Sequence, residues 1–257
     1  MARLALITGA SSGIGAEFAR IHARRGGDMI IVARRAEALE ALKAELEESE
    51  GVSVRVMPAD LTDAQAVADL CDVVRSEPIE ILINNAGFGG QGAHVDRDLG
   101  REQAMIDLNV KALVTLCHDV GGAMARRGSG RILNVGSSAG MMPGPLQAVY
   151  FATKAFVRSY SLALAEELRD HGVTVTVLAP GYVETEFADT ADLKGTRLVS
   201  GGGKSPARVA KFGYEQMTAG RLHVINEGPM SFALNWIVPL LPHRATLKMV
   251  RKMQTKG

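Results

Sequence analysis

Short apolar runs alternate with longer segments of helical periodicity along almost the whole chain, and this alternation restricts the folds it can adopt. Between two of the runs, residues 36–48 place leucines on one stripe and charges elsewhere, which is typical of a surface helix packed on a sheet. Near-continuous apolar strands separated by helices predict a parallel sheet covered on both faces. We therefore expect an α/β fold with a doubly wound parallel sheet of about seven strands, at residues 4–7, 29–33, 53–58, 81–84, 131–135, 173–179 and 223–226.

No internal repeat, low-complexity tract or linker interrupts the alternation, so we expect a single domain over residues 1–257. The least regular stretch, residues 184–204, contains three consecutive glycines and is expected to be a mobile loop. Ser205 and Pro206 follow it and are expected to begin a helix, with serine as the cap and proline in the first position. Residues 228–257 form a C-terminal extension that is apolar first and basic afterwards, without one acidic residue.

Charge and cysteine content argue against several classes of function. The chain has 29 Lys and Arg against 28 Asp and Glu, so no overall field attracts nucleic acid. Cys71, Cys117 and the six histidines show neither a disulfide framework nor metal-ligand spacing. The apolar runs at the N-terminus and at residues 232–241 are too short for a signal peptide and a transmembrane helix. We expect a cytoplasmic protein in a reducing compartment, with no metal site and no transmembrane span.

A glycine-rich segment lies between the first expected strand and the helix-like run 16–24. It reads Thr8-Gly9-Ala10-Ser11-Ser12-Gly13-Ile14-Gly15. Glycines let a backbone turn sharply and approach a phosphate closely, while a helix N-terminus offers unpaired N–H groups to the anion. The position of this segment between first strand and first helix favours dinucleotide binding over an ordinary turn.

Two arginines stand where the second expected strand ends. A cofactor with a free ribose 2′-hydroxyl is usually met at this point by an acid, which the chain lacks. Arg34, and with it Arg35, would instead pair with a 2′-phosphate, which favours NADP(H) over NAD(H). The alternative is that both arginines simply occupy an exposed strand end.

Tyr150 and Lys154 lie four residues apart and so would share one face of a helix. A tyrosine has an ordinary pKa of roughly 10, and a nearby positive charge favours its ionised form. Such a pair can act as an acid or base near neutral pH. The pair alone is weak support, because the same spacing occurs by chance on solvated helices.

Taken together, these residues resemble the short-chain dehydrogenase/reductase family, which implies a Rossmann fold and an NAD(P)-dependent oxidoreductase. The resemblance covers about residues 2–227 and keeps the family's order and approximate spacing. Its motifs are the glycine segment 8–15, Asn84-Asn85-Ala86-Gly87, Asn109, Ser137, Tyr150 with Lys154, and Pro180-Gly181.

The resemblance implies four catalytic residues. Tyr150 would exchange a proton with the substrate oxygen, and Lys154 would lower the pKa of Tyr150 and hold the nicotinamide ribose. Ser137, thirteen positions before Tyr150 as in the family, would polarise the carbonyl, whereas Ser138 would be structural. Asn109 would anchor a water that links Lys154 to solvent, or alternatively serve as a polar cap within a helix.

The resemblance also implies a cofactor site assembled from several loops. Asp60 and Leu61 would frame the adenine, and the segment after Asn84 would pass beneath the adenosine ribose. Thr185 would reach the carboxamide of the nicotinamide. The expected cofactor-binding residues are Gly9, Ser11, Ser12, Gly13, Ile14, Gly15, Arg34, Arg35, Asp60, Leu61, Asn85, Ala86, Gly87, Tyr150, Lys154, Pro180, Val183 and Thr185.

Two departures from the family pattern matter. Many NADP-using relatives carry a basic residue in the glycine loop where this chain has Ser12, so the expected NADP preference depends on Arg34 and Arg35. The extension 228–257 continues beyond the point where many relatives stop. It would lie on an anionic membrane surface, cover the substrate cleft, or pack against another subunit of a homodimer or homotetramer.

The function expected from these features is transfer of a hydride between a nicotinamide and a carbonyl or secondary alcohol, in the direction of NADPH-dependent ketone reduction. The loop 184–204 and the extension would build the substrate pocket. A lipid-like compound is one of the expected substrate classes. One alternative is an NAD-linked alcohol or hydroxysteroid dehydrogenase. Another is a non-catalytic dinucleotide-binding redox sensor, although such a sensor would need only the glycine loop.

Overall fold

Seven parallel strands form one sheet in the order β3-β2-β1-β4-β5-β6-β7 in the computed structural model, which describes residues 3–256. This arrangement confirms the expected doubly wound α/β fold. Met1, Ala2 and Gly257, at the ends of the expected domain and extension, lie outside the described residues. The strands are β1 (Leu4–Thr8), β2 (Met29–Ala33), β3 (Val54–Pro58), β4 (Ile79–Asn84), β5 (Gly130–Val135), β6 (Val173–Leu178) and β7 (His223–Val224).

Every expected strand forms, with bounds that differ by a few residues. The differences reach two residues: β4 begins two residues earlier than expected, and at β7, where residues 223–226 were expected, only His223 and Val224 pair. They lie beside Val177 and Leu178, the last two residues of β6. The edge strand ends at Val224 because its single neighbour ends at the same level.

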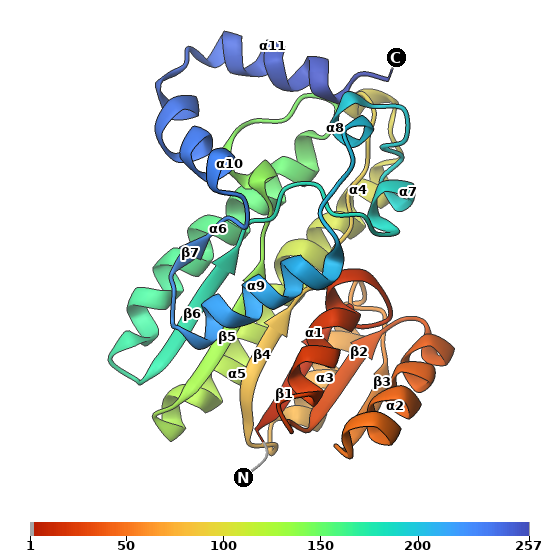
Figure 1. The fold of residues 1–257 in the computed structure, drawn as a ribbon, viewed down its shortest axis with the longest axis vertical. Helices are drawn as coiled ribbons and strands as arrows, with labels where there is room; N and C mark the ends of the chain where they lie inside the picture. Colours follow the sequence, from red (N-terminus) through yellow and green to blue (C-terminus); the bar gives the residue numbers. More distant parts are fainter. Residues whose placement is uncertain (1–2, 257) are drawn as a thin grey trace.

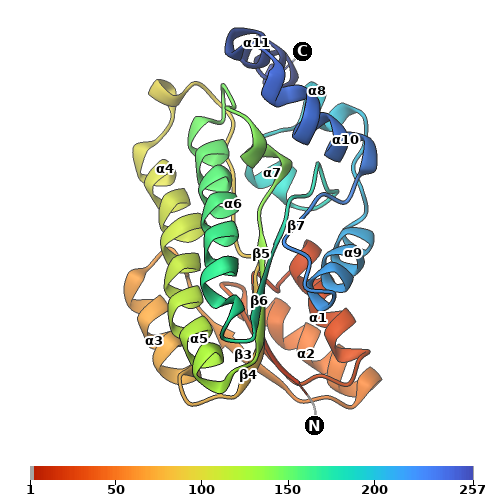
Figure 2. The same ribbon diagram turned by 90° about the vertical axis from the view of Figure 1, so that its left-hand side faces the viewer.

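Six long helices cover the sheet, three on each face (Figure 2). One face carries α1 (Gly13–Ala23), α2 (Ala36–Glu50) and α9 (Pro206–Thr218), and the other carries α3 (Ala64–Val74), α5 (Leu113–Arg127) and α6 (Ala148–Arg169). The predicted stripe of α2, namely Leu39, Leu42 and Leu46, is buried against the sheet.

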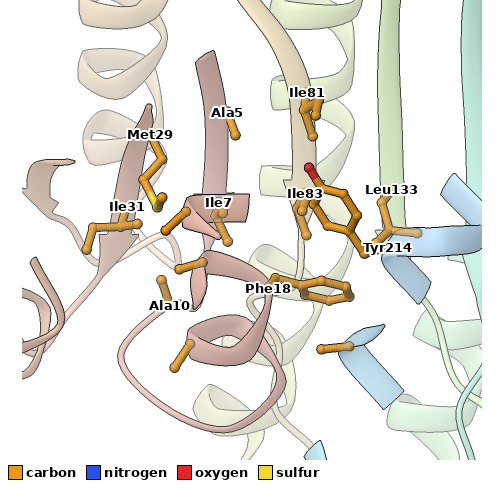
Figure 3. Close-up of a cluster of buried hydrophobic side chains, with 14 of the residues drawn as sticks. Ala5, Ile7, Ala10, Phe18, Met29, Ile31, Ile81, Ile83, Leu133 and Tyr214 are labelled. Atoms are coloured by element: carbon orange, nitrogen blue, oxygen red, sulfur yellow. The ribbon is translucent and has the colours of Figure 1, made fainter. Parts of the chain in front are cut away.

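Alternation along the strands divides their side chains between two cores. In β1, Ala5 and Ile7 face α1 and α9, whereas Leu6 between them belongs to the core under α3 and α5. Figure 3 shows the first of these cores, in which Phe18 of α1 lies among the strand side chains with none of its surface exposed. Truncating a side chain of this kind costs about 3–5 kcal/mol.

The carboxyl ends of the strands meet at the edge of the sheet farthest from the N-terminus, and the remaining helices gather there (Figure 1). They are α4 (Leu99–Ile106), α7 (Phe187–Thr190), α8 (Arg197–Ser200), α10 (Gly228–Phe232) and α11 (His243–Gln254). Open α/β sheets bind their ligands at this edge.

Residues 184–204 contain two short helices, α7 and α8, that the sequence does not predict, and Lys204 forms a bridge with Val183. The expected start of α9 is confirmed: Pro206 is its first residue and Ser205 Oγ accepts a hydrogen bond from the Arg208 backbone N–H at 3.3 Å. Among the helices within residues 3–256, none combines the length and apolar character needed to cross a membrane.

Candidate active site

The glycine loop between β1 and α1 is built by close approach of backbone to backbone. Gly9 has φ +67°, and a Cβ on it would lie 2.8 Å from Ala86 Cα. A Cβ on Gly15 would lie 2.1 Å from the Gly9 carbonyl oxygen, which no side chain can accommodate. Both positions therefore require glycine for packing alone, before any ligand is considered.

Side chains from β4 and β1 lock this loop in place. Asn85 Nδ2 donates to the carbonyl oxygens of Thr8 and Gly9, both at 3.1 Å. In return, Thr8 Oγ1 accepts from the backbone N–H groups of Asn85 and Ala86, also at 3.1 Å. The predicted residues of the β1 and β4 loops thus form one unit at the centre of the sheet edge.

The N-terminus of α1 is open to an anion. Ser12 precedes the helix, and its hydroxyl does not cap it but donates to Glu186 Oε2 at 2.9 Å. The first N–H groups of the helix consequently lack a side-chain acceptor, and the helix dipole favours negative charge at this point. Gly13 has φ +56° and its Cβ position is 3.0 Å from Thr185 Cγ2, which brings the predicted nicotinamide side against the loop.

The two arginines after β2 differ in their surroundings. Arg34 is exposed. Arg35 instead pairs with Glu186, with Nη2 to Oε2 at 2.8 Å, and its guanidinium also approaches Ser11 Oγ at 3.3 Å. The hydrogen bond from Arg35, followed by that from Ser12, lowers the pKa of the Glu186 carboxyl. Glu186, which sequence reasoning missed, therefore places a negative charge beside the arginine expected to meet a 2′-phosphate.

The remaining predicted cofactor residues lie along the same edge. Asp60 and the buried Leu61 follow β3, the strand next to β2, after which the two arginines stand. Asp60 Oδ1 accepts hydrogen bonds from the backbone N–H and the hydroxyl of Thr62 at 3.0 and 2.9 Å. Pro180 and the buried Val183 follow β6, on the Thr185 side. The site therefore extends across the sheet rather than closing into a compact cluster.

Tyr150 and Lys154 lie on the first turns of α6, where both are buried. Lys154 Nζ donates to the Val135 carbonyl at 2.8 Å and stands 5.9 Å from the centre of the Tyr150 ring. Ser137 follows β5, and its Oγ accepts from the Ala139 N–H at 3.1 Å. The structure thus brings the predicted tyrosine, lysine and serine together on α6 and the end of β5.

Burial dominates the electrostatics of this pair. It raises the pKa of Tyr150 to about 12, and a hydrogen bond with Ser137 offsets part of that rise. It lowers the pKa of Lys154 to about 8 because the charged ammonium loses its hydration. The direction at Tyr150 is opposite to the lowering expected from Lys154, and desolvation is the reason. The phenol is therefore held protonated, ready to donate.

Asn109 connects the two sides of the site. It lies within a π-helical turn, Asp107–Ala112, that joins α4 to α5. Its Oδ1 accepts from the Phe88 N–H at 3.1 Å, and its Nδ2 donates to the Phe88 carbonyl at 3.0 Å and to Thr153 Oγ1 at 3.1 Å. Asn109 therefore fixes the chain after β4 against α6, and a π-helical turn frequently marks a functional site.

Several residues near Tyr150 were not identified from sequence. Phe187 of α7 packs against the phenol, with ring centres 5.4 Å apart, and Val250 of α11 joins the same apolar cluster. Gln147 stands just before α6, and its Nε2 donates a hydrogen bond at 2.6 Å to Gln254 at the end of α11. The sequence carries no local signal for these contacts, because they join segments far apart in the chain.

The residues present fit a dinucleotide. A Cβ on Gly87 would stand 3.5 Å from Lys154 Nζ, so the glycine leaves the space above the lysine open to a ribose. The uncapped helix, the loop glycines and the exposed Arg34 supply donors for phosphates along the same edge. Within residues 3–256, His, Cys, Asp and Glu side chains do not form a group of three that could hold a metal ion.

Several known proteins with similar sequences or structures are named reductases or dehydrogenases. Sulfoacetaldehyde reductase 2 of Chromohalobacter salexigens is 41% identical over 192 residues, covering 73% of this chain and 75% of the relative. The 17-beta-hydroxysteroid dehydrogenase type 3 of Mus musculus is 33% identical over 199 residues, covering 77% of this chain and 65% of the relative. A short-chain dehydrogenase from Sphingobium yanoikuyae in complex with NADPH has a TM-score of 0.83 at 35% identity, covering 87% of each chain.

The family description "short chain dehydrogenase" matches residues 3–194, which hold the sheet as far as β6, the glycine loop, Ser137, Tyr150 and Lys154. The match agrees with the fold and with the fit of the edge to a dinucleotide. The chain therefore belongs to the short-chain dehydrogenase/reductase family, enzymes that transfer a hydride with a nicotinamide dinucleotide.

Proposed function

We propose that the protein reduces a ketone carbonyl with NADPH, with Tyr150 as the proton donor. The observation that carries this proposal is the buried phenol, which stays protonated to about pH 12 beside Ser137 and Lys154. When bound, the reduced nicotinamide supplies the hydride that reaches the carbonyl carbon. Ser137 and Tyr150 hydrogen-bond the carbonyl oxygen, and Tyr150 gives up its proton as charge develops there.

The other site residues would position the reactants. Lys154 would hold the nicotinamide ribose, while Asn109 keeps the chain after β4 and Thr153 of α6 in register through its three hydrogen bonds. Thr185, packed against the glycine loop, would reach the carboxamide. Each of these roles depends on geometry that the protein supplies by itself.

A preference for NADP(H) is favoured by Arg34, which is exposed beside the glycine loop and available to a 2′-phosphate. Arg35 is less available because Glu186 holds it at 2.8 Å. The similar Sphingobium yanoikuyae enzyme was solved with NADPH, which supports the same preference. The NAD-linked dehydrogenase alternative would require NADH to bind at least as well.

An apolar, lipid-like carbonyl compound suits the surroundings of Tyr150. The cluster around the phenol contains Met105, Phe151 and Val250, with Met142 and Phe187 packed against it. Apolar surface of a substrate buried against such side chains is stabilised by about 25 cal/mol per Å². The similarity to a hydroxysteroid dehydrogenase points the same way, whereas the similarity to a sulfoacetaldehyde reductase would suit a small anionic aldehyde.

We further propose one domain with residues 184–204 as its substrate loop and residues 228–257 as an extension over the cleft. We also propose a homodimer or homotetramer in the cytoplasm. Its assembly is supported by α6, which exposes Phe156 stacked on Tyr160 with ring centres 5.7 Å apart. Contact of the extension with a membrane surface fits its basic composition.

The test is NADPH oxidation over a panel of ketones, ketosteroids, 3-ketoacyl thioesters, sugars and small aldehydes. We expect turnover with at least one carbonyl class, and Tyr150→Phe should lower that turnover at least about a hundredfold while NADPH affinity stays nearly unchanged. Unchanged turnover in Tyr150→Phe would remove the assignment of the proton donor. Tight NADPH binding without oxidation across the panel would instead support the redox-sensor alternative.

A further inference from the structure

The turns that follow β7 expose large apolar side chains on one side. Phe232, Trp236, Ile237 and Leu240 are 62%, 68%, 47% and 84% exposed. Phe232, Trp236 and Leu240 recur every four residues along α10 and the helical turns after it, so they share a face, and Ile237 stands next to Trp236. Leu234, between them, is buried beside Ala179 and Ile225. An exposed apolar face of this kind marks an interaction surface.

The helix that follows is basic on its outer side. In α11, Thr246, Val250 and Gln254 form the buried stripe, and the opposite side carries exposed cations. These are Arg244, Lys248, Arg251 and Lys252. Among residues 3–256, none of these four pairs with a carboxylate, whereas the neighbouring Lys256 pairs with Asp192 at 2.7 Å. The outer side of α11 therefore presents uncompensated positive charge.

We propose that this surface, from Phe232 to Lys252, docks on an anionic phospholipid bilayer. Phenylalanine, tryptophan and leucine suit the boundary between headgroups and acyl chains, and lysine or arginine beside them attracts lipid phosphates. Both parts lie on the segment that forms the end of the molecule opposite the N-terminus (Figure 1). A bilayer presents both chemistries at once, apolar chains and negative phosphates.

A second copy of this chain suits the surface less well. A twofold contact places the same patch of both subunits against each other. The cations of α11 would then face their own copies, and like charges brought together across an interface are unfavourable. With no acidic residue between 228 and 256, the segment offers nothing to neutralise them.

The inner side of the same segment packs into the apolar cluster that contains Tyr150. Val250 packs with Tyr150 and Phe151, and the Gln147–Gln254 hydrogen bond ties α11 to the start of α6. Docking would therefore hold the substrate cleft at the bilayer surface, where apolar carbonyl compounds partition. This consequence depends on the proposed reductase function, but the docking itself does not.

Trp236 makes the docking directly measurable, because it is the only tryptophan in the chain. The full chain would be mixed with vesicles of phosphatidylcholine alone or with one quarter phosphatidylglycerol. We expect co-flotation and a blue shift of Trp236 emission with the anionic vesicles only, weakening as salt is raised. Absence of both signals on anionic vesicles would overturn the proposal.

Paired variants separate the two parts of the surface. Arg244→Glu with Lys248→Glu should weaken vesicle binding at least about tenfold. The matched change on α9, Arg208→Glu with Lys211→Glu, alters the same net charge on exposed residues and should weaken it far less. Equal losses in both pairs would mean that only total charge matters, and the assigned surface would be wrong.

The apolar half is tested by Phe232→Ser with Ile237→Ser, which leaves the Trp236 reporter in place. We expect at least about a tenfold loss of binding, whereas Leu222→Ser, an exposed leucine just before β7, should bind as wild type. Sedimentation without lipid gives the competing outcome: if the double variant dissociates an oligomer and wild type ignores vesicles, the surface is a subunit interface. Vesicle binding without turnover on any carbonyl would retain the docking and reject the reductase function.

Discussion

The glycine loop and the C-terminal extension both lie at the carboxyl edge of the sheet, yet they hold their shape by different means. The loop depends on backbone contacts so short that a Cβ on Gly15 would stand 2.1 Å from a carbonyl oxygen. The extension depends on side chains, such as Val250 against Tyr150 and Gln254 beside Gln147. A backbone-built site tolerates almost no change at its glycines, whereas a side-chain-built site can be altered residue by residue.

This difference also separates what the two regions can recognise. Backbone N–H groups at the start of α1 suit a pyrophosphate, which is the same in every dinucleotide cofactor. Side chains such as Phe187 and Val250 can be exchanged without rebuilding the backbone, so they suit the part that must select a substrate. The family match ends at residue 194, before most of that second region.

The comparison is tested most severely by Gly15→Ala. The added methyl meets the Gly9 carbonyl, and overpacking of this kind costs typically about 1–3 kcal/mol. We expect NADPH affinity, measured by fluorescence titration, to fall up to about a hundredfold, together with a lower melting temperature. The matched change is Gly122→Ala in α5, where the nearest atom to the new Cβ is 3.6 Å away. Indistinguishable behaviour of the two variants would break the comparison.

A second test concerns the one side chain proposed to set cofactor choice within the backbone-built region. Arg34→Asp removes a cation and adds an anion where a 2′-phosphate would lie, and hydrogen bonds to charged groups are worth about 1.5–3 kcal/mol. We expect NADPH affinity to fall by at least about tenfold while NADH affinity is unchanged or higher. Equal losses for both cofactors would show that Arg34 supports the loop rather than the phosphate.

The catalytic rate and the cofactor affinity should depend differently on pH. Burial lowers the pKa of Lys154 to about 8, so its charge is present below pH 8 and is lost as pH rises through that value. Tyr150 stays protonated to about pH 12, so it does not limit the rate there. We expect kcat/KM for reduction to be flat below pH 8 and to fall about tenfold per unit above it.

NADPH affinity should change much less over the same range, because backbone N–H groups and arginine hold most of the cofactor and Lys154 would contact only the nicotinamide ribose. Lys154→Arg retains a positive charge to higher pH and should shift the falling limb upward, whatever its effect on the plateau. A falling limb unchanged in Lys154→Arg would assign the titration to another group.

The smallest change in cofactor affinity is expected at Glu186, whose carboxylate pairs with Arg35. Glu186→Gln removes the carboxylate that pairs with Arg35, and exposed pairs of this kind contribute about 0–1 kcal/mol. We expect NADPH affinity to rise about two- to threefold relative to NADH. Glu166→Gln, which opens the similarly exposed pair with Arg169 on α6, is the control and should leave both affinities unchanged.

The sequence was most informative where structure depends on local rules. The seven strands, the leucine stripe of α2 and the Ser205 cap all followed from residues a few positions apart. Among the proposed cofactor residues, the glycine loop and the two arginines follow from the same logic, whereas the others, such as Asp60 and Thr185, came from the family resemblance. The grouping of Tyr150, Lys154 and Ser137 came from the family resemblance, and their common location agrees with it.

Contacts between distant segments could not be predicted. Glu186 reaches Arg35 across 151 positions, and no pattern around either residue indicates the pair. The pKa of Tyr150 was expected to fall because Lys154 is near in sequence, but burial, a property of the whole fold, raises it. The helices within residues 184–204 are only four residues long each, too short for periodicity to reveal.

The hydrogen bond between Gln147 and Gln254 joins residues 107 positions apart. A ribosome adds about 5–20 residues per second, so the start of α6 is made roughly 5–20 s before the end of α11, which packs on it. During synthesis, Tyr150 and Phe151 therefore wait with their apolar neighbours unshielded. The apolar cluster around Tyr150 is complete only when α11 has emerged and folded back, so the order of synthesis decides when this part of the fold closes.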